Sequence, residues 1–244
     1  MFENYPKKRT ELPQKYKDIY EEHYKKNRIG ETKASSLSQK MESWLHKKVS
    51  ADLTDYPQKT LEIGAGTLNH LKYEKISTYD IVEPFHELFS NSPDLKLINT
   101  VYNSIYEIKN SEQYDRIISI ATFEHITDLP LVVAKSCLLM KKDGCLRVAI
   151  PNEGSFIWKL AYELTTGIEF KIMYNLKYST LMNYEHVNTA REIEDILNYF
   201  FGSVKQSHLG LNKQLSFYRF FECTKPEITK AVNYIESQKI KFND

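Results

Sequence analysis

The chain contains few of the residues that mark specialised protein classes. Only 3 of its 244 residues are cysteines, Cys137, Cys145 and Cys223, and no two of them have C-x-x-C spacing. This scarcity argues against a disulfide framework and against a zinc site, so we expect a reducing compartment and no bound metal. Basic and acidic side chains nearly balance, at 33 and 32, so the chain lacks the electrostatic footprint of a duplex-binding protein.

Long apolar runs are also missing. No stretch approaches the ~20 apolar residues that a membrane-spanning helix needs. The first ten residues, MFENYPKKRT, have no apolar core and do not form a secretory signal. We therefore expect a cytoplasmic protein with neither membrane insertion nor a nucleic-acid partner. Its 41% hydrophobic and 27% charged residues are typical of a globular protein with one decorated α/β domain, or at most two small domains.

The two ends of the chain have helical patterns. Segments 11–27 and 35–49 carry apolar residues on one helical face, and no strand pattern separates them. Residues 1–57 are therefore predicted to form an N-terminal helical cap. Residues 227–244 are predicted to be a closing helix or tail, which leaves 58–226 as the main domain.

Within that domain, short apolar runs alternate with helical stretches. Strands are predicted at 60–64, 79–83, 95–101, 114–120 and 145–151. Intervening helices, such as 128–144 with its Gly stop, indicate crossover connections and a mainly parallel sheet. After a helix at 189–202, the runs 203–210 and 214–224 have no helix between them. We expect these two to pair as a hairpin and to add an antiparallel strand.

A glycine turn follows the first predicted strand, in LEIGAGTLNHL (61–71), and a helix is expected soon after it. A nucleoside triphosphate site needs G-x-x-x-x-G-K-[ST], which is absent, and a dinucleotide site needs a third Gly where Asn69 stands. S-adenosylmethionine carries no phosphate, so Gly64 and Gly66 suffice to leave room for its methionine part and its ribose. Glu62 is close enough to contact its amino end. Glu83, at the tip of the next strand, can accept both ribose hydroxyls, although it would serve NAD equally well.

Five segments resemble, in order and spacing, the class I S-adenosylmethionine-dependent methyltransferases. They are LEIGAGTLNHL, IVEPFHEL, VYNSIYEI, YDRIISIATFEHITD and LLMKKDGCLRVAIP, and together they cover roughly residues 58–151. The likeness is strongest to the group whose fourth strand ends in LEH, here Phe123-Glu124-His125. It implies a Rossmann-like, seven-stranded, mostly parallel sheet whose last strand is antiparallel. Segment 151–189 resembles, more loosely, sugar- and polysaccharide-associated members.

The resemblance also implies a set of cofactor contacts. The glycine segment would face the methionine part, an acid the ribose, and the end of the fourth strand the sulfonium. One departure concerns the adenine border, where many relatives have Asp in place of Ser104. The implied contacts are Gly64, Ala65, Gly66, Glu83, Pro84, Ser104, Ile105, Ala121, Thr122 and Phe123.

Two histidines are candidates for removing a proton from the methyl acceptor. His125 follows a strand's carboxyl end, where open α/β sheets bind ligands, and His186 precedes the last helix of the domain. A reference pKa near 6.5 suits either ring to act as a base at neutral pH. The alternative for each is a hydrogen-bonded structural histidine that ties a loop to the sheet.

An aromatic-rich insertion at 152–188 is predicted to roof the acceptor pocket. Its rings, joined by a tyrosine of the N-terminal helix, are suited to sugars or flat metabolites, and the alternative is a lid that simply packs on the sheet. The substrate candidates are Tyr24, Trp158, Tyr162, Tyr178 and Tyr184. We therefore expect a methyltransferase for a small-molecule acceptor, such as a sugar or nucleotide sugar. A nicotinamide-dependent oxidoreductase and a non-catalytic binding protein remain open alternatives.

Overall fold

One mixed sheet runs through the molecule. The computed structural model describes residues 2–20, 36–75 and 77–241. This part of the chain forms a seven-stranded sheet in the order β3-β2-β1-β4-β5-β7-β6. Only β7 runs against its neighbours, β5 and β6, which confirms the predicted α/β sheet with an antiparallel last strand. The strands are β1 Lys59–Ile63, β2 Thr78–Val82, β3 Thr100–Tyr102, β4 Tyr114–Ile120, β5 Met140–Pro151, β6 Phe201–Gly210 and β7 Ser216–Pro226.

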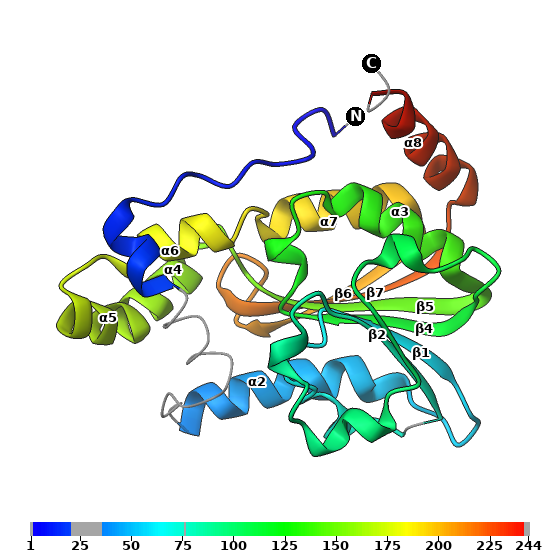
Figure 1. Ribbon diagram of the computed structural model, residues 1–244, viewed down its shortest axis with the longest axis horizontal. Helices are drawn as coiled ribbons and strands as arrows, with labels where there is room; N and C mark the ends of the chain where they lie inside the picture. The colour runs from blue at the N-terminus through cyan, green and yellow to red at the C-terminus, as the bar shows by residue number, and fades with distance from the viewer. Residues whose placement is uncertain (1, 21–35, 76, 242–244) are drawn as a thin grey trace.

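Helices cover both faces of this sheet (Figure 1). α3 (Leu129–Leu139), α7 (Ala190–Phe200) and α8 (Ile228–Lys241) pack on one face, and α2 (Ser36–Val49) crosses the other. The helices predicted at 35–49 and 189–202 are thereby confirmed over their described residues, and the closing segment predicted at 227–244 is helical at Ile228–Lys241. Among the residues that the structure describes, no helix is both long and apolar enough to cross a membrane.

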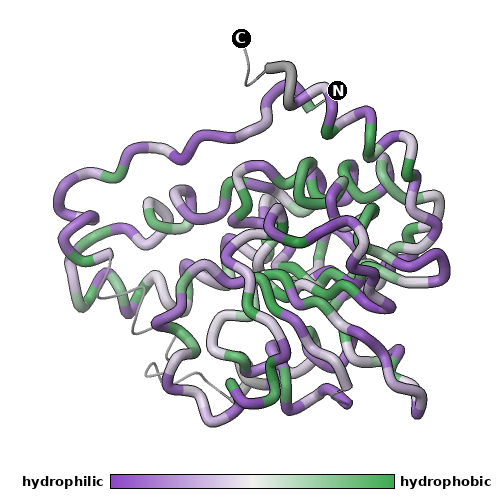
Figure 2. The backbone as a smooth tube through the Cα atoms, turned by 45° about the vertical axis from the view of Figure 1, so that its right-hand side comes forward, coloured by the Kyte–Doolittle hydropathy of each residue, from purple (hydrophilic) through white to green (hydrophobic). Residues whose placement is uncertain are grey.

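Alternation along the strands builds a core on each face. Leu61 and Ile63 of β1 belong to the cluster under α3 and α7, whereas Ile118 of β4 packs with Leu45 of α2. Successive strand residues point to opposite faces, so Glu62 faces the α2 side. Figure 2 shows hydrophobic residues gathered on the strands and the helices against them, while the N-terminal segment is mostly hydrophilic.

The helix expected after the glycine turn is absent. Between β1 and β2 the described residues contain only a 3-10 helix, Leu71–Tyr73, and 3-10 helices also occupy the next two crossovers. Gly66 and Leu68 have φ values of +52° and +64°. Residues with such values cannot belong to a right-handed helix. A helix therefore cannot begin before Leu68, and few residues remain for one before β2.

Two other predicted boundaries are wrong. The strand expected at 95–101 starts only at Thr100, because the Ser92 hydroxyl caps a 3-10 helix at Pro93–Leu97. The helix expected at 128–144 ends at Leu139, after which the chain pairs with β4. Gly144, interpreted as a helix stop, instead lies in β5, where an added Cβ would come within 2.9 Å of the carbonyl oxygen of Asp115.

The first residues form an extended segment rather than part of a helical cap. Residues 14–20 are helical, whereas residues 2–13, here called the strap, contain no helix and lie along the face that carries α7 (Figure 1). The strap is held by its side chains: the Tyr5 hydroxyl donates to Asn188 at 2.8 Å, and the Lys7 ammonium donates to the Val187 carbonyl at 2.8 Å.

The predicted insertion at 152–188 consists of three short helices, α4 (Phe156–Leu164), α5 (Thr166–Tyr174) and α6 (Tyr178–Glu185). Leu12 and Tyr16 of the N-terminal segment form a separate small core with two residues of these helices, Phe170 and Leu181. The insertion is therefore packed against residues 12–20 as well as against the sheet.

A buried polar cluster fixes α2 to its face of the sheet. Arg116 of β4 is fully buried, and its guanidinium donates to Glu74, Asp52, the Thr60 hydroxyl and the carbonyl of Val49, near the C-terminal end of α2. Every donor of the fork thus has an acceptor, as a buried cation requires.

Two histidines extend this cluster. His70 Nε2 contacts Glu74 Oε1 at 2.8 Å, and His70 Nδ1 contacts His46 Nδ1 at 2.9 Å. We call His46, His70, Glu74 and Arg116 the α2-face cluster. Its role is to anchor the helix.

Candidate functional site

The two glycines of the turn after β1 have different reasons to be glycine. Gly64 has φ +78°, and an added Cβ would lie 2.3 Å from the side chain of Thr122. Gly66 has φ +52°, and an added Cβ would meet no atom within 4 Å. Gly64 is thus required by packing against the end of β4, while Gly66 borders open space that a ligand can enter.

Glu83 lies beside that space, at the end of β2. It is only 2% exposed, and its carboxylate accepts the Gly66 N–H at 2.8 Å and the Phe85 N–H at 3.0 Å. Two backbone donors therefore orient the acid against the glycine turn. Each carboxylate oxygen retains a further acceptor position for a ribose hydroxyl.

Glu62 is held away from solvent on the α2 side. Its carboxyl group accepts the Tyr79 hydroxyl at 2.8 Å, and burial raises its pKa to about 8 despite that hydrogen bond. The group is therefore mostly protonated at neutral pH. A protonated carboxyl group would meet the amino end of a ligand as a neutral partner.

The end of β4 forms the other wall of the turn. Ala121 is exposed and has φ +48°, a left-handed conformation that costs a non-glycine residue about 1–2 kcal/mol. Such local strain is common where a site fixes the backbone. The Thr122 hydroxyl donates to the Ile120 carbonyl at 3.1 Å, and its side chain packs over Gly64.

The remaining predicted cofactor residues differ in exposure. Ala65, Ile105 and Phe123 are buried in the hydrophobic cores, so their side chains serve packing and only their main chain can meet a ligand. Pro84 is exposed next to Glu83, and the Ser104 hydroxyl caps a 3-10 helix by accepting the Tyr106 N–H at 3.3 Å.

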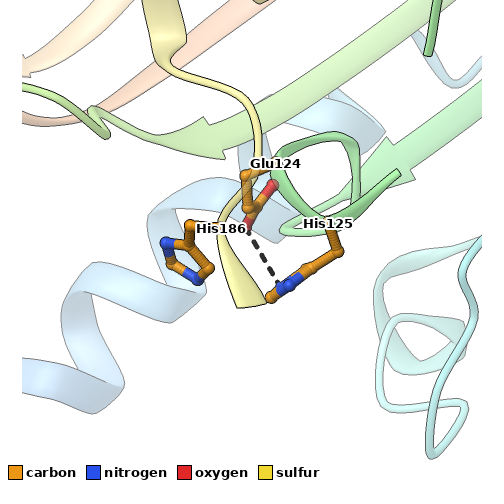
Figure 3. A group of neighbouring side chains, drawn as sticks. All are labelled: Glu124, His125 and His186. Atoms are coloured by element: carbon orange, nitrogen blue, oxygen red, sulfur yellow. Dashed lines mark ion pairs between the residues drawn. The ribbon is translucent and has the colours of Figure 1, made fainter. Parts of the chain in front are cut away.

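The structure brings the two candidate histidines together. The rings of His125 and His186 are 4.7 Å apart between centroids, with an edge-to-face angle of 79°. Figure 3 shows the carboxylate of Glu124 beside the two rings, with its ion pair to His125 dashed. The closest ligand atoms of the three residues all lie within 4.8 Å of one another. We call Glu124, His125 and His186 the strand-end cluster, because Glu124 lies four residues after the end of β4.

Main-chain hydrogen bonds join the two loops that carry this cluster. The N–H groups of Val187 and Asn188 both donate to the Glu124 carbonyl, at 2.8 and 3.0 Å. The side-chain amide of Asn188 donates to the carbonyls of Phe123 and Ile126, at 2.8 and 2.7 Å. The position of His186 beside His125 is therefore fixed by these main-chain hydrogen bonds together with the side chain of Asn188.

Carboxylates surround the two rings. His186 Nδ1 contacts Glu153 Oε2 at 2.6 Å, and His125 Nδ1 lies 3.6 Å from Glu185 Oε2. Burial lowers the pKa of His186, but the hydrogen bond to Glu153 and the charges of Glu124 and Glu185 outweigh burial, so its pKa is raised.

The predicted substrate aromatics form a contiguous row. Trp158 donates its indole N–H to Glu153 at 2.7 Å and contacts Tyr162, which in turn contacts Tyr178. Tyr184 is part of the small core with Tyr20, at a centroid distance of 5.3 Å. The row extends from the small core to the strand-end cluster. Tyr24 lies outside the described residues.

Three residues of this region escaped the sequence analysis. Glu153, after β5, joins His186 to Trp158; Asn188 joins the loops; and Arg9 of the strap donates to the carbonyls of His125, Tyr184 and Glu185. The position of Glu153 at a strand's carboxyl end was a usable signal. Nothing in the sequence indicated Arg9.

Comparisons with known proteins give relatives by structure alone. No family model matches the chain, and no curated protein matches its sequence. A possible histamine N-methyltransferase from Thermotoga maritima matches 86% of this chain and 98% of its own, with 15% identity and a TM-score of 0.56. The N-methyltransferase NodS from Bradyrhizobium japonicum, solved with S-adenosylhomocysteine, matches 88% of this chain and 100% of its own, with 11% identity and a TM-score of 0.56.

A carbon methyltransferase, CurJ, has a comparable likeness. It matches 88% of this chain and 62% of its own, with 16% identity and a TM-score of 0.57. At identities this low, the structural match establishes only the arrangement of the strands and helices. The chemistry must be argued from the residues of the site. The glycine turn, the acid after β2 and the seven-stranded sheet agree with that arrangement. The chain has the fold of the class I S-adenosylmethionine-dependent methyltransferases.

Proposed function

We propose that the protein is an S-adenosylmethionine-dependent methyltransferase. The observation that carries this proposal is the opening at Gly66, whose missing side chain leaves space beside the buried carboxylate of Glu83. The turn has no third glycine for a pyrophosphate, because Asn69 occupies that position. A ligand with an adenosyl group and no phosphate fits both features. Relatives by structure have been solved with S-adenosylhomocysteine, which supports the same ligand.

The proposed reaction is an in-line displacement. The sulfonium supplies an activated methyl group, and the acceptor atom forms the new bond as the carbon–sulfur bond breaks, leaving S-adenosylhomocysteine and a proton. The protein's main contribution is to hold the acceptor near attack distance, an effect equivalent to an effective concentration of ~10⁵–10⁸ M. We assign the activation of the acceptor to His125, which follows the strand end that borders the glycine turn, and to His186, which follows α6 and meets it there.

We further propose a small-molecule acceptor of the sugar or nucleotide-sugar class. The row of Trp158, Tyr162 and Tyr178 places aromatic rings next to acidic groups, an arrangement suited to a hydroxyl-rich ligand, and of the three Trp158 and Tyr178 are partly exposed while Tyr162 is buried. Structural relatives methylate nitrogen or carbon by their names, so the fold leaves the acceptor atom open. A panel of sugars, nucleotide sugars and amines, assayed for S-adenosylhomocysteine release, tests this part separately.

Calorimetric binding of S-adenosylhomocysteine tests the cofactor assignment. Glu83→Gln keeps one acceptor oxygen but removes the charge, and hydrogen bonds to charged groups contribute about 1.5–3 kcal/mol, so we expect affinity to fall about 10–100-fold. Gly66→Val should abolish binding by filling the open space. The matched control is Gly202→Ala, which lies in β6 away from the turn.

Two results would contradict the assignment. One is unchanged affinity in Glu83→Gln with a normal thermal melt. The other is tighter binding of NAD than of S-adenosylhomocysteine, which would favour the oxidoreductase alternative. Binding without turnover on any acceptor would leave the non-catalytic alternative standing.

A further inference from the structure

The strand-end cluster has the composition of a metal site. It offers two imidazoles and one carboxylate, with the nearest ligand atoms within 4.8 Å of one another (Figure 3). Glu124 and His125 come from the loop after β4, and His186 follows α6, so two separate segments converge on one point. A set of two histidines and one carboxylate leaves positions for further ligands on a first-row transition metal.

The outer partners of the two rings fix which nitrogen faces inward. His186 Nδ1 is 2.6 Å from Glu153 Oε2, and His125 Nδ1 is 3.2 Å from the Glu185 carbonyl oxygen. Carboxylate and carbonyl oxygens can only accept, so each Nδ1 must carry the hydrogen. In the neutral rings the lone pair is then on Nε2. For His125 this nitrogen lies 3.8 Å from Glu124 Oε1.

This pairing of a histidine with an outer acceptor is the usual support of a metal-ligating imidazole. The outer acceptor holds the ring, sets its tautomer and increases the basicity of the inward nitrogen. Both rings of the strand-end cluster have such a partner, and Glu153 is itself held by the indole N–H of Trp158 at 2.7 Å. A histidine that only ties a loop needs one hydrogen bond and no inward carboxylate.

The charge around the cluster also favours a cation. Three carboxylates, on Glu124, Glu153 and Glu185, lie close to the two rings. The nearby guanidinium of Arg9 is bound to the carbonyl oxygens of His125, Tyr184 and Glu185 and makes no ion pair with these carboxylates. A divalent ion would offset negative charge that is now partly buried.

We propose that Glu124, His125 and His186 bind a divalent first-row transition-metal ion. Metal–ligand distances of about 2.0–2.2 Å place ligand atoms about 3.4 Å apart in a tetrahedral site, so the longest separation in the cluster must contract by about 1.4 Å. Imidazole ligands favour zinc, cobalt or iron over magnesium. The proposal replaces the expectation of no metal drawn from the cysteines.

The role of the ion rests on the proposed methyl transfer. An acceptor hydroxyl bound to the ion would release its proton to water more readily, and its oxygen would attack the methyl carbon as the carbon–sulfur bond breaks. His125 and His186 would then act as ligands rather than as the base itself. Metal binding does not depend on this role.

A cobalt(II) titration of the chelator-treated full chain tests the site. Binding is monitored by calorimetry and by visible absorption. We expect one equivalent bound, with magnesium unable to compete. Loss of an outer partner typically lowers metal affinity about 10–100-fold. His186→Ala and His125→Ala remove a ligand itself, so each should lower cobalt affinity by more than that. Glu153→Gln retains an acceptor for His186 and the fold, and should weaken binding within that range.

The matched control is His46→Gln, in the α2-face cluster, which should bind cobalt as the unchanged protein does. The proposal is overturned if the unchanged protein binds no cobalt, or if His125→Ala and His186→Ala bind it equally well. Binding of S-adenosylhomocysteine to the same samples separates the two ideas. Cobalt without the nucleoside refutes the methyltransferase, and the nucleoside without cobalt refutes the metal site.

Discussion

The described part of the chain contains two histidine pairs, and they are built in opposite ways. In the α2-face cluster, the rings of His46 and His70 stack at 5.1 Å and point Nδ1 at Nδ1, 2.9 Å apart. In the strand-end cluster, the rings of His125 and His186 meet edge to face at 4.7 Å, and each Nδ1 turns outward to an oxygen. The two rings of the first pair are hydrogen-bonded to each other. Each ring of the second pair is hydrogen-bonded to another residue, His125 to the Glu185 carbonyl and His186 to Glu153.

This difference separates a structural pair from a ligand site. Within the first pair one Nδ1 must donate and the other accept, and His70 Nε2 donates to Glu74, so the lone pair of His70 is already used. Burial lowers the pKa of His70 more than Glu74 raises it, which keeps that ring neutral. In the second pair Nε2 of His125 lies 3.8 Å from Glu124 Oε1. The orientation of the rings, rather than the presence of histidine, distinguishes the two.

The largest effect should come from removing the cation of the structural cluster. Arg116→Met removes the guanidinium that joins Glu74 to Asp52, and leaves Glu74 with the ring of His70 and Asp52 with the guanidinium of Arg147. Breaking a buried ion pair from one side costs about 3–5 kcal/mol, so urea unfolding should show a loss of that size. Cobalt binding by the remaining folded protein should be unchanged. A loss of cobalt binding at full stability would show that the two clusters are not independent.

A more gradual effect, spread over several pH units, should act through Glu62, on the same face. Burial raises its pKa from 4.5 to about 8, so the folded state holds its proton where the unfolded state does not. This contribution to stability is complete below pH 4.5, is lost as pH rises toward 8, and is absent above it. The slope should approach about 1.4 kcal/mol per pH unit.

Glu62→Gln is the variant that tests this dependence. It keeps an oxygen for the Tyr79 hydroxyl and cannot titrate, so its stability between pH 5 and pH 8 should change less than that of the unchanged protein. Parallel curves for the two proteins would exclude Glu62 as the source.

The smallest effect is expected from His70→Leu. Leucine fills a similar volume, and Glu74 keeps both of its bonds from Arg116, so only the hydrogen bonds of one ring are lost. A net loss of about 1 kcal/mol is expected in urea unfolding. Its S-adenosylhomocysteine and cobalt affinities should equal those of the unchanged protein. A drop in either affinity would remove the distinction between the pairs.

Much of the fold could be predicted because its signals are local. Residues close together in the sequence indicate the alternation in β1 and β4 and the hairpin of β6 and β7. The same is true of α7, which begins with a Thr189–Glu192 capping box. The crossover after Gly66 could not be predicted in this way. Its 3-10 conformation follows from the positive φ of Leu68, which no local rule for leucine indicates.

The same distinction between local and long-range signals applies to the residues of the site. Gly64, Gly66 and Glu83 belong to short motifs, so their positions followed from sequence order. The meeting of His125 with His186 depends on Asn188, which binds two carbonyls of the loop after β4. The contribution of Arg9 depends on contacts between residues 116–176 positions apart. Such distant pairings carry no pattern in a single sequence.

The strap sets an order for how the protein acquires its shape. Tyr5 is joined to Asn188 across 183 positions, so its contact cannot form until most of the polypeptide is present. Closing so long a loop is entropically costly and favours late formation. During synthesis the glycine turn and its acid can be organised first, whereas the histidine loops gain their final support only when the earliest residues return to meet them. A newly made chain would then recognise the nucleoside before it can position an acceptor.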